Sequence, residues 1–321
     1  MNPKRGTAFW DRLPPGRHTQ RIGSRGPAFN VTVLRGRPGR AAVINAGTHG
    51  DEYEGPTVIQ SWIDSLDPAR IRGTLVLIPV LHEAAFFAGT RSHPIDGSNL
   101  ARVFPGKPKG NHAERLADQF LRRVLRFADY YLDLHSGGVA YDLLPWCGYM
   151  ITGQRELDAV QHEMAACFDE YWCWGSPYLA GRTLSSAATE GVAAIYTESR
   201  GGGGVHPEDV TALDRGIRNF LRRFGFLSGG LPRLKQQRVR LARRSDEAHL
   251  QLHHPAPGAG LFLPAVAIGA TIRKKALLGR VVALDQKSSW PVLAEHGGTV
   301  VCLRRKRSVE RGDALATLVS I

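Results

Sequence analysis

The sequence predicts an α/β protein in which a mixed, largely parallel sheet is flanked by helices and followed by a smaller all-β domain. Two observations predict this fold class. In the larger, N-terminal part of the chain, apolar runs typical of buried strands alternate with segments of helical periodicity. After that part the chain has only short β-prone runs with glycine-rich turns. The length of 321 residues suits two such units, and we predict domains at residues 1–232 and 233–321.

The individual elements are predicted from apolar patterning and from the turn residues at their ends. Pro56, for example, lies in the first turn of its predicted helix, where a missing N–H costs nothing. The predicted strands of the larger domain lie at residues 27–36, 40–47, 73–81, 129–135, 143–151 and 191–198. Its predicted helices lie at residues 56–67, 111–128, 156–168 and 207–226. The predicted strands of the smaller domain lie at residues 260–266, 278–285, 298–304 and 314–321.

The composition is that of a soluble globular protein, with 43% hydrophobic and 22% charged residues. The formal net charge of +13 would suit a nucleic-acid partner if the basic residues were concentrated. They are instead scattered, with short clusters at residues 238–244 and 304–307 and no interleaved aromatic residues. A solvated basic surface is therefore favoured over nucleic-acid binding.

The cysteines and the apolar runs bear on the location of the protein. Four cysteines without a CxxC pair predict reduced thiols and a cytoplasmic location. The N-terminus lacks the apolar core of a signal peptide, and the run at residues 258–272 is too short to span a bilayer. We therefore expect no membrane partner. The aromatic stretch at residues 171–174 favours core packing or an oligomer contact, so a homo-oligomer is possible.

Two histidines and a glutamate follow predicted parallel strands. His49 and Glu52 come directly after the strand at 40–47, and His135 ends the strand at 129–135. Ligand sites of open α/β sheets form at the carboxyl ends of such strands. Two neutral imidazoles and a carboxylate suit Zn²⁺ with a fourth position open for water, which is the arrangement of a hydrolytic site. The alternative is that His49 and His135 are two unrelated members of the twelve histidines in the chain.

A long loop at residues 88–106 supplies further candidates. Its Arg91 and Arg102 are suited to gripping an oxyanion or a carboxylate, although a solvated arginine is the simpler role for each. His93 lies between them and could add a contact, but an exposed loop histidine is an equally good expectation. His112, just after the loop, is expected at the surface.

A carboxylate near the metal would move the proton of the attacking water. Glu198 is the best candidate, because it ends a buried strand and is followed by the glycine tract at residues 201–204. Glu190 and Glu208 are weaker candidates, since they fall at a helix edge and in a helix start. The glycines let the backbone pass close to a ligand or a metal shell, or they form a flexible connector. They lack the GxGxxG pattern of a dinucleotide site.

Four motifs in a fixed order give the chain a resemblance to a known family. They are HGDEYEG (49–55), AGTRSHPIDGSNLARVFPG (88–106), DLHSGG (133–138) and TESRGGGG (197–204). They resemble the motifs of the succinylglutamate desuccinylase/aspartoacylase family, relatives of the zinc carboxypeptidases. Within the family the N-acetyl-diaminobutyrate deacetylase-like branch is the most similar. The resemblance covers essentially the whole chain and implies a zinc-carboxypeptidase-like fold.

The resemblance also implies roles for the candidate residues. One Zn²⁺ per chain would be bound by His49, Glu52 and His135. Glu198 would be the general base and then the general acid. Arg91 would polarise the scissile carbonyl and stabilise the oxyanion.

The implied substrate-binding residues are Asn99, Ala101 and Arg102, with Arg102 holding a substrate carboxylate. The family pattern reads NLNR, whereas this chain reads Asn99-Leu100-Ala101-Arg102. Ala101 thus lacks an amide expected to help bind that carboxylate. One hydrogen bond to a charged group is worth roughly 1.5 to 3 kcal/mol. The specific substrate is therefore left open.

The sequence thus predicts a zinc-dependent amidohydrolase that cleaves the linear amide of a small N-acyl amino acid or related amine, with acetyl as the expected acyl group. Its partner is then a small N-acylated molecule. Two alternatives are kept. One is a carboxypeptidase-like peptidase, and the other is a catalytically silent protein that binds anionic partners through its basic surface.

Overall fold

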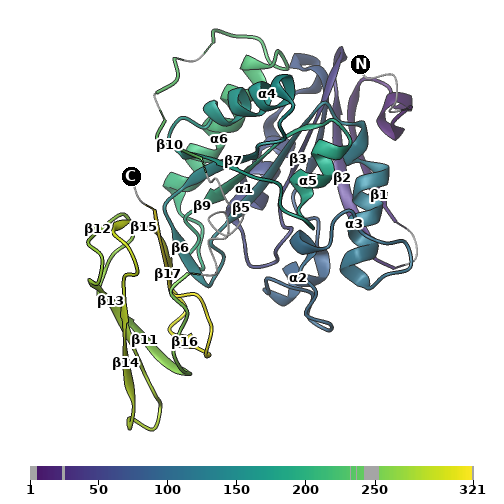
Figure 1. The fold of residues 1–321 in the computed structure, drawn as a ribbon. Helices are drawn as coiled ribbons and strands as arrows, with labels where there is room; N and C mark the ends of the chain where they lie inside the picture. Colours follow the sequence, from purple (N-terminus) through teal and green to yellow (C-terminus); the bar gives the residue numbers. More distant parts are fainter. Residues whose placement is uncertain (1–5, 24–25, 232, 236, 242–252, 320–321) are drawn as a thin grey trace.

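The computed structural model describes residues 6–23, 26–231, 233–235, 237–241 and 253–319 (Figure 1). The predicted domain limit at residue 232, part of the basic cluster at 238–244 and the end of the last predicted strand, 320–321, lie outside the described residues.

A nine-stranded mixed sheet forms the body of the larger part (Figure 1). Its order is β1 (Gly16–Ile22), β2 (Phe29–Arg35), β4 (Arg72–Ile78), β3 (Arg37–Asn45), β5 (Tyr130–Ser136), β9 (Ala193–Ser199), β7 (Trp146–Met150), β8 (Trp172–Ser176) and β10 (Val239–Leu241). The strands β4, β3, β5 and β9 are parallel to one another, as predicted. Strand β1 was not predicted, and β7 runs antiparallel to β9.

Helices cover both faces of this sheet (Figure 1). One face is covered by α1 (Glu54–Ser65), α4 (Arg155–Ala166) and α6 (Pro207–Arg223). The other is covered by α3 (His112–Arg123) and α5 (Thr183–Thr189). A short helix, α2 (Glu83–Ala88), follows β4. The 3-10 helices are η1 (Phe9–Arg12), η2 (Pro68–Arg70), η3 (Leu100–Arg102) and η4 (Leu125–Phe127).

Helix α3 shows how local sequence sets an element. Asn111 accepts a hydrogen bond from the Glu114 N–H at 2.9 Å, and the Glu114 side chain accepts one from the Asn111 N–H at 3.0 Å. This capping box starts the helix, and its apolar stripe buries Leu116 and Phe120 completely against the sheet. The helix ends at Arg123, and η4 continues the stretch that was predicted as one helix.

The central parallel strands bring the ends of distant segments together. Asn45 at the end of β3 is the register partner of Asp133 on β5. His135 on β5 is in turn the partner of Glu198 on β9. Parallel pairing therefore places side chains from three segments at one edge of the sheet.

The C-terminal part is built of strands, as predicted, and these strands pair antiparallel. One sheet contains β11 (Gly260–Pro264), β13 (Leu277–Val282), β14 (Ser289–Leu293) and β16 (Ser308–Val309). The other contains β12 (Thr271–Ile272), β15 (Gly298–Arg304), β17 (Ala316–Val319) and, from the larger part of the chain, β6 (Tyr141–Leu143). Their shared core includes Phe262 and Leu315.

Strand β6 joins the two parts, because its Leu143 pairs with Cys302 on β15 (Figure 1). Trp146, Trp174 and Val301 pack in one buried cluster at this junction. Trp174 therefore has the core role predicted for the aromatic stretch. The predicted limits of the domains, 1–232 and 233–321, stay a prediction.

The four cysteines are buried free thiols, in agreement with the absence of a CxxC pair. Burial raises the pKa of Cys147 well above its usual value, so this thiol is inert. Among the described residues, no helix combines the length and the apolar character needed to cross a bilayer.

Gly148 provides a test of how the sheet shapes the site. It is the register partner of Tyr196, and a Cβ at Gly148 would lie 2.0 Å from a Tyr196 ring carbon. We expect Gly148→Ala to displace that ring and to lower the free energy of unfolding by about 1–3 kcal/mol, the usual cost of overpacking. Urea unfolding measures this, with Gly230→Ala as the control because its Cβ would meet nothing within 4 Å. Equal stability of both variants and the wild type would contradict it.

Candidate metal centre and active site

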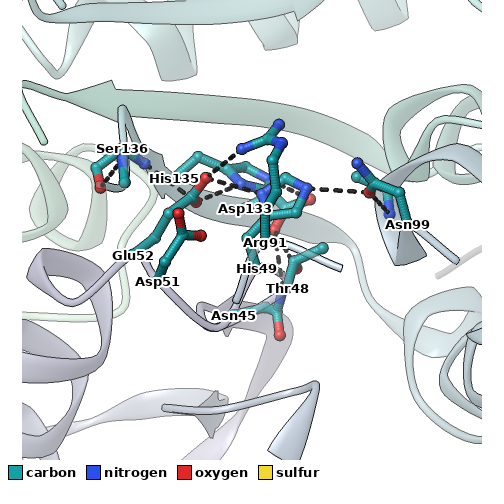
Figure 2. Close-up of polar contacts among 12 residues, drawn as sticks. Asn45, Thr48, His49, Asp51, Glu52, Arg91, Asn99, Asp133, His135 and Ser136 are labelled. Carbon is teal, nitrogen blue, oxygen red and sulfur yellow. Dashed lines mark hydrogen bonds and ion pairs between the residues drawn. The ribbon is translucent and has the colours of Figure 1, made fainter. Parts of the chain in front are cut away.

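The site is built around the buried carboxylate of Glu52, in the loop between β3 and α1 (Figure 2). Its Oε1 lies 2.8 Å from His49 Nδ1 and accepts a hydrogen bond from Arg91 Nη1 at 3.0 Å. Its Oε2 accepts bonds from His135 Nδ1 at 2.9 Å and from the Ser136 N–H at 3.2 Å. Burial alone would raise the pKa of Glu52, but the two imidazoles outweigh it and hold this pKa well below its usual range. Glu52 is therefore a buried anion that gathers four cationic or polar groups.

His135 lies between two carboxylates. Its Nε2 is 3.3 Å from Asp133 Oδ2, on the side opposite Glu52. Asp133 is itself held by the Asn45 side chain, which donates to Oδ1 at 2.8 Å. Burial lowers the pKa of His135, but Asp133 and Glu52 together raise it well above the usual value. Without a metal, His135 is therefore protonated at neutral pH.

His49 is also buried, with an acceptor facing each ring nitrogen. Its Nδ1 faces Glu52, and its Nε2 lies 3.1 Å from Asn99 Oδ1. Desolvation, followed by the charge of Arg91, lowers the pKa of His49 to about 4, so the ring is neutral at pH 7. A neutral imidazole donates only one hydrogen bond. The ring can therefore donate to only one of its two acceptors. A cation bound at the other nitrogen would take the place of the missing proton.

These contacts fit a metal ion. One ligand atom each of His49, Glu52 and His135 lies within 4.8 Å of the other two, and all three residues are buried. His49 Nδ1 and His135 Nδ1 each face a carboxylate oxygen of Glu52. A divalent cation between these nitrogens and the carboxylate would bind both kinds of ligand atom. Asp133 would then orient His135 from behind, as carboxylates do for zinc-bound histidines. The sequence-predicted ligand set is thus gathered with the donor chemistry that suits Zn²⁺.

A cavity of about 430 Å³ opens beside this group. Seven residues that the sequence predicted for the site line it: His49, Arg91, Asn99, Ala101, Arg102, His135 and Glu198. Glu52 lies behind His49 and His135 rather than in the lining. Apolar side chains, among them Met150 and Leu179, form another part of the wall. The cavity has the size and mixed lining of a small-molecule site.

Glu198 lines the cavity next to the metal ligand set. It is the register partner of His135 on the neighbouring strand. Desolvation raises the pKa of Glu198, His135 lowers it and Glu52 raises it again, with a net rise to about 8. A carboxyl with a raised pKa is suited to taking and returning a proton near neutral pH. Glu190, a weaker candidate, instead lies 3.7 Å from Arg126 and is absent from the cavity lining.

Three arginines make the cavity cationic: Arg91, Arg102 and Arg182. Desolvation by the cavity walls, followed by the charges of Arg182 and Arg91, lowers the pKa of Arg102 although its side chain reaches solvent. A guanidinium stays charged despite such a shift. The crowding of these charges therefore favours an anionic ligand.

Asn99 connects the long loop to the metal ligands. Its Oδ1 accepts a hydrogen bond from the Ala101 N–H at 2.9 Å, which starts η3, and the same oxygen lies 3.1 Å from His49 Nε2 (Figure 2). Ala101 lines the cavity with a methyl group. The position where the family pattern has asparagine thus borders the binding space.

Two carboxylates on either side of Glu52 also anchor the neighbouring strand ends, Asp51 from the same loop and Glu54 from the start of α1. Asp51 accepts a hydrogen bond from the Val139 N–H at 3.2 Å, and Glu54 accepts one from the Gly201 N–H at 3.1 Å. A Cβ at Gly201 would lie 2.5 Å from the Gly137 Cα. The glycine tract thus permits a close approach between two backbones, which differs from both predicted roles, contact with a ligand and flexible connection.

Two sequence expectations were wrong. His93 is buried rather than exposed, and His112 is half-buried rather than a surface residue. Their rings stack with centroids 4.3 Å apart. The motif at residues 88–106 gave no sign of this, because His112 lies outside it.

Sequence reasoning also missed Asp133, Arg182 and Tyr196. Asp133 could have been found, since it lies two residues before His135 on a strand and therefore faces the same side. Arg182 lies in no motif, and its position depends on the loop between β8 and α5. Tyr196 has the sequence context of an ordinary core residue in a buried strand.

The chain is similar to known proteins in sequence and in fold. The model of the succinylglutamate desuccinylase/aspartoacylase catalytic domain matches residues 38–224, more than half of the chain. The chain belongs to this family. Its predicted fold class and its recognition from four motifs are thereby confirmed, and the family contains deacylases that cleave amides.

Relatives match over nearly the full length. The N-alpha-acetyl-L-2,4-diaminobutyric acid deacetylase of Halomonas elongata is 32% identical over 301 residues, which cover 91% of this chain and 85% of the relative. The product-bound structure of the ectoine utilization protein EutE (DoeB) from Ruegeria pomeroyi has 28% identity and a TM-score of 0.84, covering 96% of each chain. A succinylglutamate desuccinylase from Silicibacter sp. TM1040 has 26% identity and a TM-score of 0.85, covering 95% of each chain.

The raised pKa of His135 gives a prediction for metal binding. A zinc ligand must be a neutral imidazole, so His135 must lose its proton when the metal binds. We expect Zn²⁺ binding to the metal-free protein at pH 7 to release about one proton, and the affinity to fall as the pH is lowered. Calorimetric titration in buffers of different ionisation enthalpy measures the released protons. A binding enthalpy that is the same in every buffer would contradict this.

Proposed function

We propose that this chain is a zinc-dependent deacylase. It removes an acyl group from a small amino acid or related amine, and acetyl is the acyl group we propose. One observation carries the proposal. His49, Glu52 and His135 form a buried set with the donor chemistry of a zinc site, and its two histidines line a cavity together with Glu198 and Arg91. One catalytic Zn²⁺ per chain is part of the proposal.

The substrate class is supported by the cavity and by the relatives. Three arginines around a space of about 430 Å³ suit a small molecule with a carboxylate. A matching relative is named as a deacetylase of N-alpha-acetyl-L-2,4-diaminobutyric acid. An N-acetylated amino acid with a free carboxylate combines both features.

The residues would divide the reaction between them. A bound Zn²⁺ would lower the pKa of a water molecule and polarise the amide carbonyl. Glu198 removes a proton from the water as its oxygen attacks the amide carbon. The carbon–nitrogen bond then breaks, and Glu198 returns that proton to the departing amine, so acid and amine are released with Glu198 restored.

Two groups of arginines serve the two ends of the substrate. Arg91 already bonds to Glu52 at 3.0 Å, and it turns its remaining N–H donors to the oxyanion that develops at the carbonyl. Arg102 binds the substrate carboxylate, and Arg182 also lines the cavity. Ala101 leaves that carboxylate without the amide donor of the family pattern.

Hydrolysis of a panel tests the function directly. The panel contains N-acetyl and N-succinyl amino acids, N-acetylated diamines without a carboxylate, and dipeptides. We expect the N-acetyl amino acids to be cleaved fastest, the activity to be lost with a chelator, and Zn²⁺ to restore it. Faster cleavage of dipeptides would favour the carboxypeptidase alternative, and salt-sensitive nucleic-acid binding without hydrolysis would favour the silent one.

Glu198→Gln separates proton transfer from metal binding. Glutamine keeps the size of the side chain but cannot accept the proton of the water, so we expect kcat to fall by about 10²–10⁴-fold with the bound zinc unchanged. Steady-state kinetics and elemental analysis measure the two effects. Glu190→Gln is the matched control and should keep both wild-type values. An active Glu198→Gln variant would remove Glu198 from its role.

Ala101→Asn tests the carboxylate end. The added amide should supply a hydrogen bond to a charged group, worth roughly 1.5 to 3 kcal/mol, and so lower KM about tenfold or more for a carboxylate substrate. The same substitution should leave KM unchanged for an N-acetylated amine without a carboxylate. An equal effect on both substrates would place position 101 away from the carboxylate.

A further inference from the structure

A second group of histidines lies outside the catalytic cavity. Its members are His82 at the N-cap of α2, His93 in the long loop and His112, the first residue of α3. One nitrogen of each lies within 4.8 Å of those of the other two. His82 is fully buried and His93 is 7% exposed. Three separate segments of the chain thus direct imidazoles to one point.

Several nitrogens of these rings have no hydrogen-bond partner among the described residues. Within the described part of the chain, no hydrogen bond reaches either ring nitrogen of His82, or the Nδ1 of His93 or His112. The Thr48 backbone lies near His82 without forming a hydrogen bond of good geometry. His93 Nδ1 is 3.3 Å from Asp96 Oδ1, again without hydrogen-bond geometry. Buried polar atoms without a partner destabilise a fold, so a ligand for these nitrogens would stabilise it.

The chemistry of the group matches a transition metal. Burial lowers the pKa of His82 to about 4 and also lowers that of His112, so these rings are in the neutral form that binds metal. Imidazole ligands suit Zn²⁺ and related divalent ions. In a tetrahedral site with zinc–nitrogen bonds of about 2.0–2.1 Å, ligand nitrogens lie about 3.4 Å apart. Asp96 beside His93 adds a negative charge.

Rotation of the imidazole rings would be needed to complete the geometry. The rings are stacked, with centroids 4.3 Å apart for His93 and His112 and 5.7 Å apart for His82 and His93. A metal lies in the plane of each imidazole that binds it, so the rings must turn about their Cβ–Cγ bonds. That torsion is soft for histidine.

We propose that His82, His93 and His112 form a second metal site for Zn²⁺ or a similar divalent transition metal, and that the ion holds the long loop in place. The His93 N–H bonds to the Ser98 carbonyl, and the His93 carbonyl accepts from the Gly97 N–H, both at 2.9 Å. Fixing His93 therefore fixes the turn between Arg91 and Asn99. The site ties that turn to the starts of α2 and α3.

Counting bound zinc tests the site. Untagged protein is stripped with a chelator, loaded with Zn²⁺, freed of excess metal by gel filtration and analysed for zinc per chain. We expect two equivalents for the wild type and one each for His112→Gln, His93→Gln and His49→Ala. The double variant His49→Ala, His112→Gln should bind none. His162→Gln, which removes an exposed histidine on α4, is the matched control and should keep two.

The variants separate the two metal sites. Circular dichroism confirms that each is folded, and the half-buried His112 makes His112→Gln the mildest change in the group. The proposal is wrong if His112→Gln and His93→Gln bind as much zinc per chain as the wild type. This holds whatever the zinc content of His49→Ala is. A wild type that binds one equivalent, lost in His49→Ala, would overturn it while supporting the catalytic metal.

Discussion

The site depends on one buried carboxylate. Glu52 is 2% exposed, yet it remains ionised because two imidazoles, a guanidinium and a backbone N–H surround it. An unpaired carboxylate at this depth would be very costly, and its partners come from three separate segments of the chain. The negative charge of Glu52 that orders these partners without metal is also the charge that the proposed zinc ion would bind. The charge of Glu52 therefore contributes both to folding and to the proposed metal binding.

The loop around Glu52 extends this organisation to the neighbouring strands. Asp51 holds the turn after β5, and Glu54 holds the glycine tract after β9, through backbone N–H groups. The register of β5 and β9 then sets His135 beside Glu198. The proposed metal ligand His135 and the proposed proton carrier Glu198 are thus positioned by strand pairing, which is more rigid than a loop. The long loop brings Arg91 and Arg102, and His93 of the proposed second metal site lies in the same loop.

Much of this could be predicted from the sequence, and the physical reasons are specific. Continuous apolar runs identified the parallel strands, and polar residues at their carboxyl ends identified His49, Glu52, His135 and Glu198, which the structure gathers at one cavity. The antiparallel direction of β7 and the pairing of β6 with β15 leave no local pattern, because they depend on contacts distant in the chain. The stacked histidines were missed for the same reason. Taken one at a time in the sequence, His82, His93 and His112 look like ordinary polar residues.

The most direct test of the catalytic centre is an anomalous difference map at the zinc absorption edge, from crystals of protein that is active in solution. We expect a zinc ion bound by His49, Glu52 and His135 at about 2.0–2.2 Å, with the Glu198 carboxyl facing it across the cavity. Crystals of the active protein with no anomalous peak among these three residues would contradict a zinc-dependent reaction at this site.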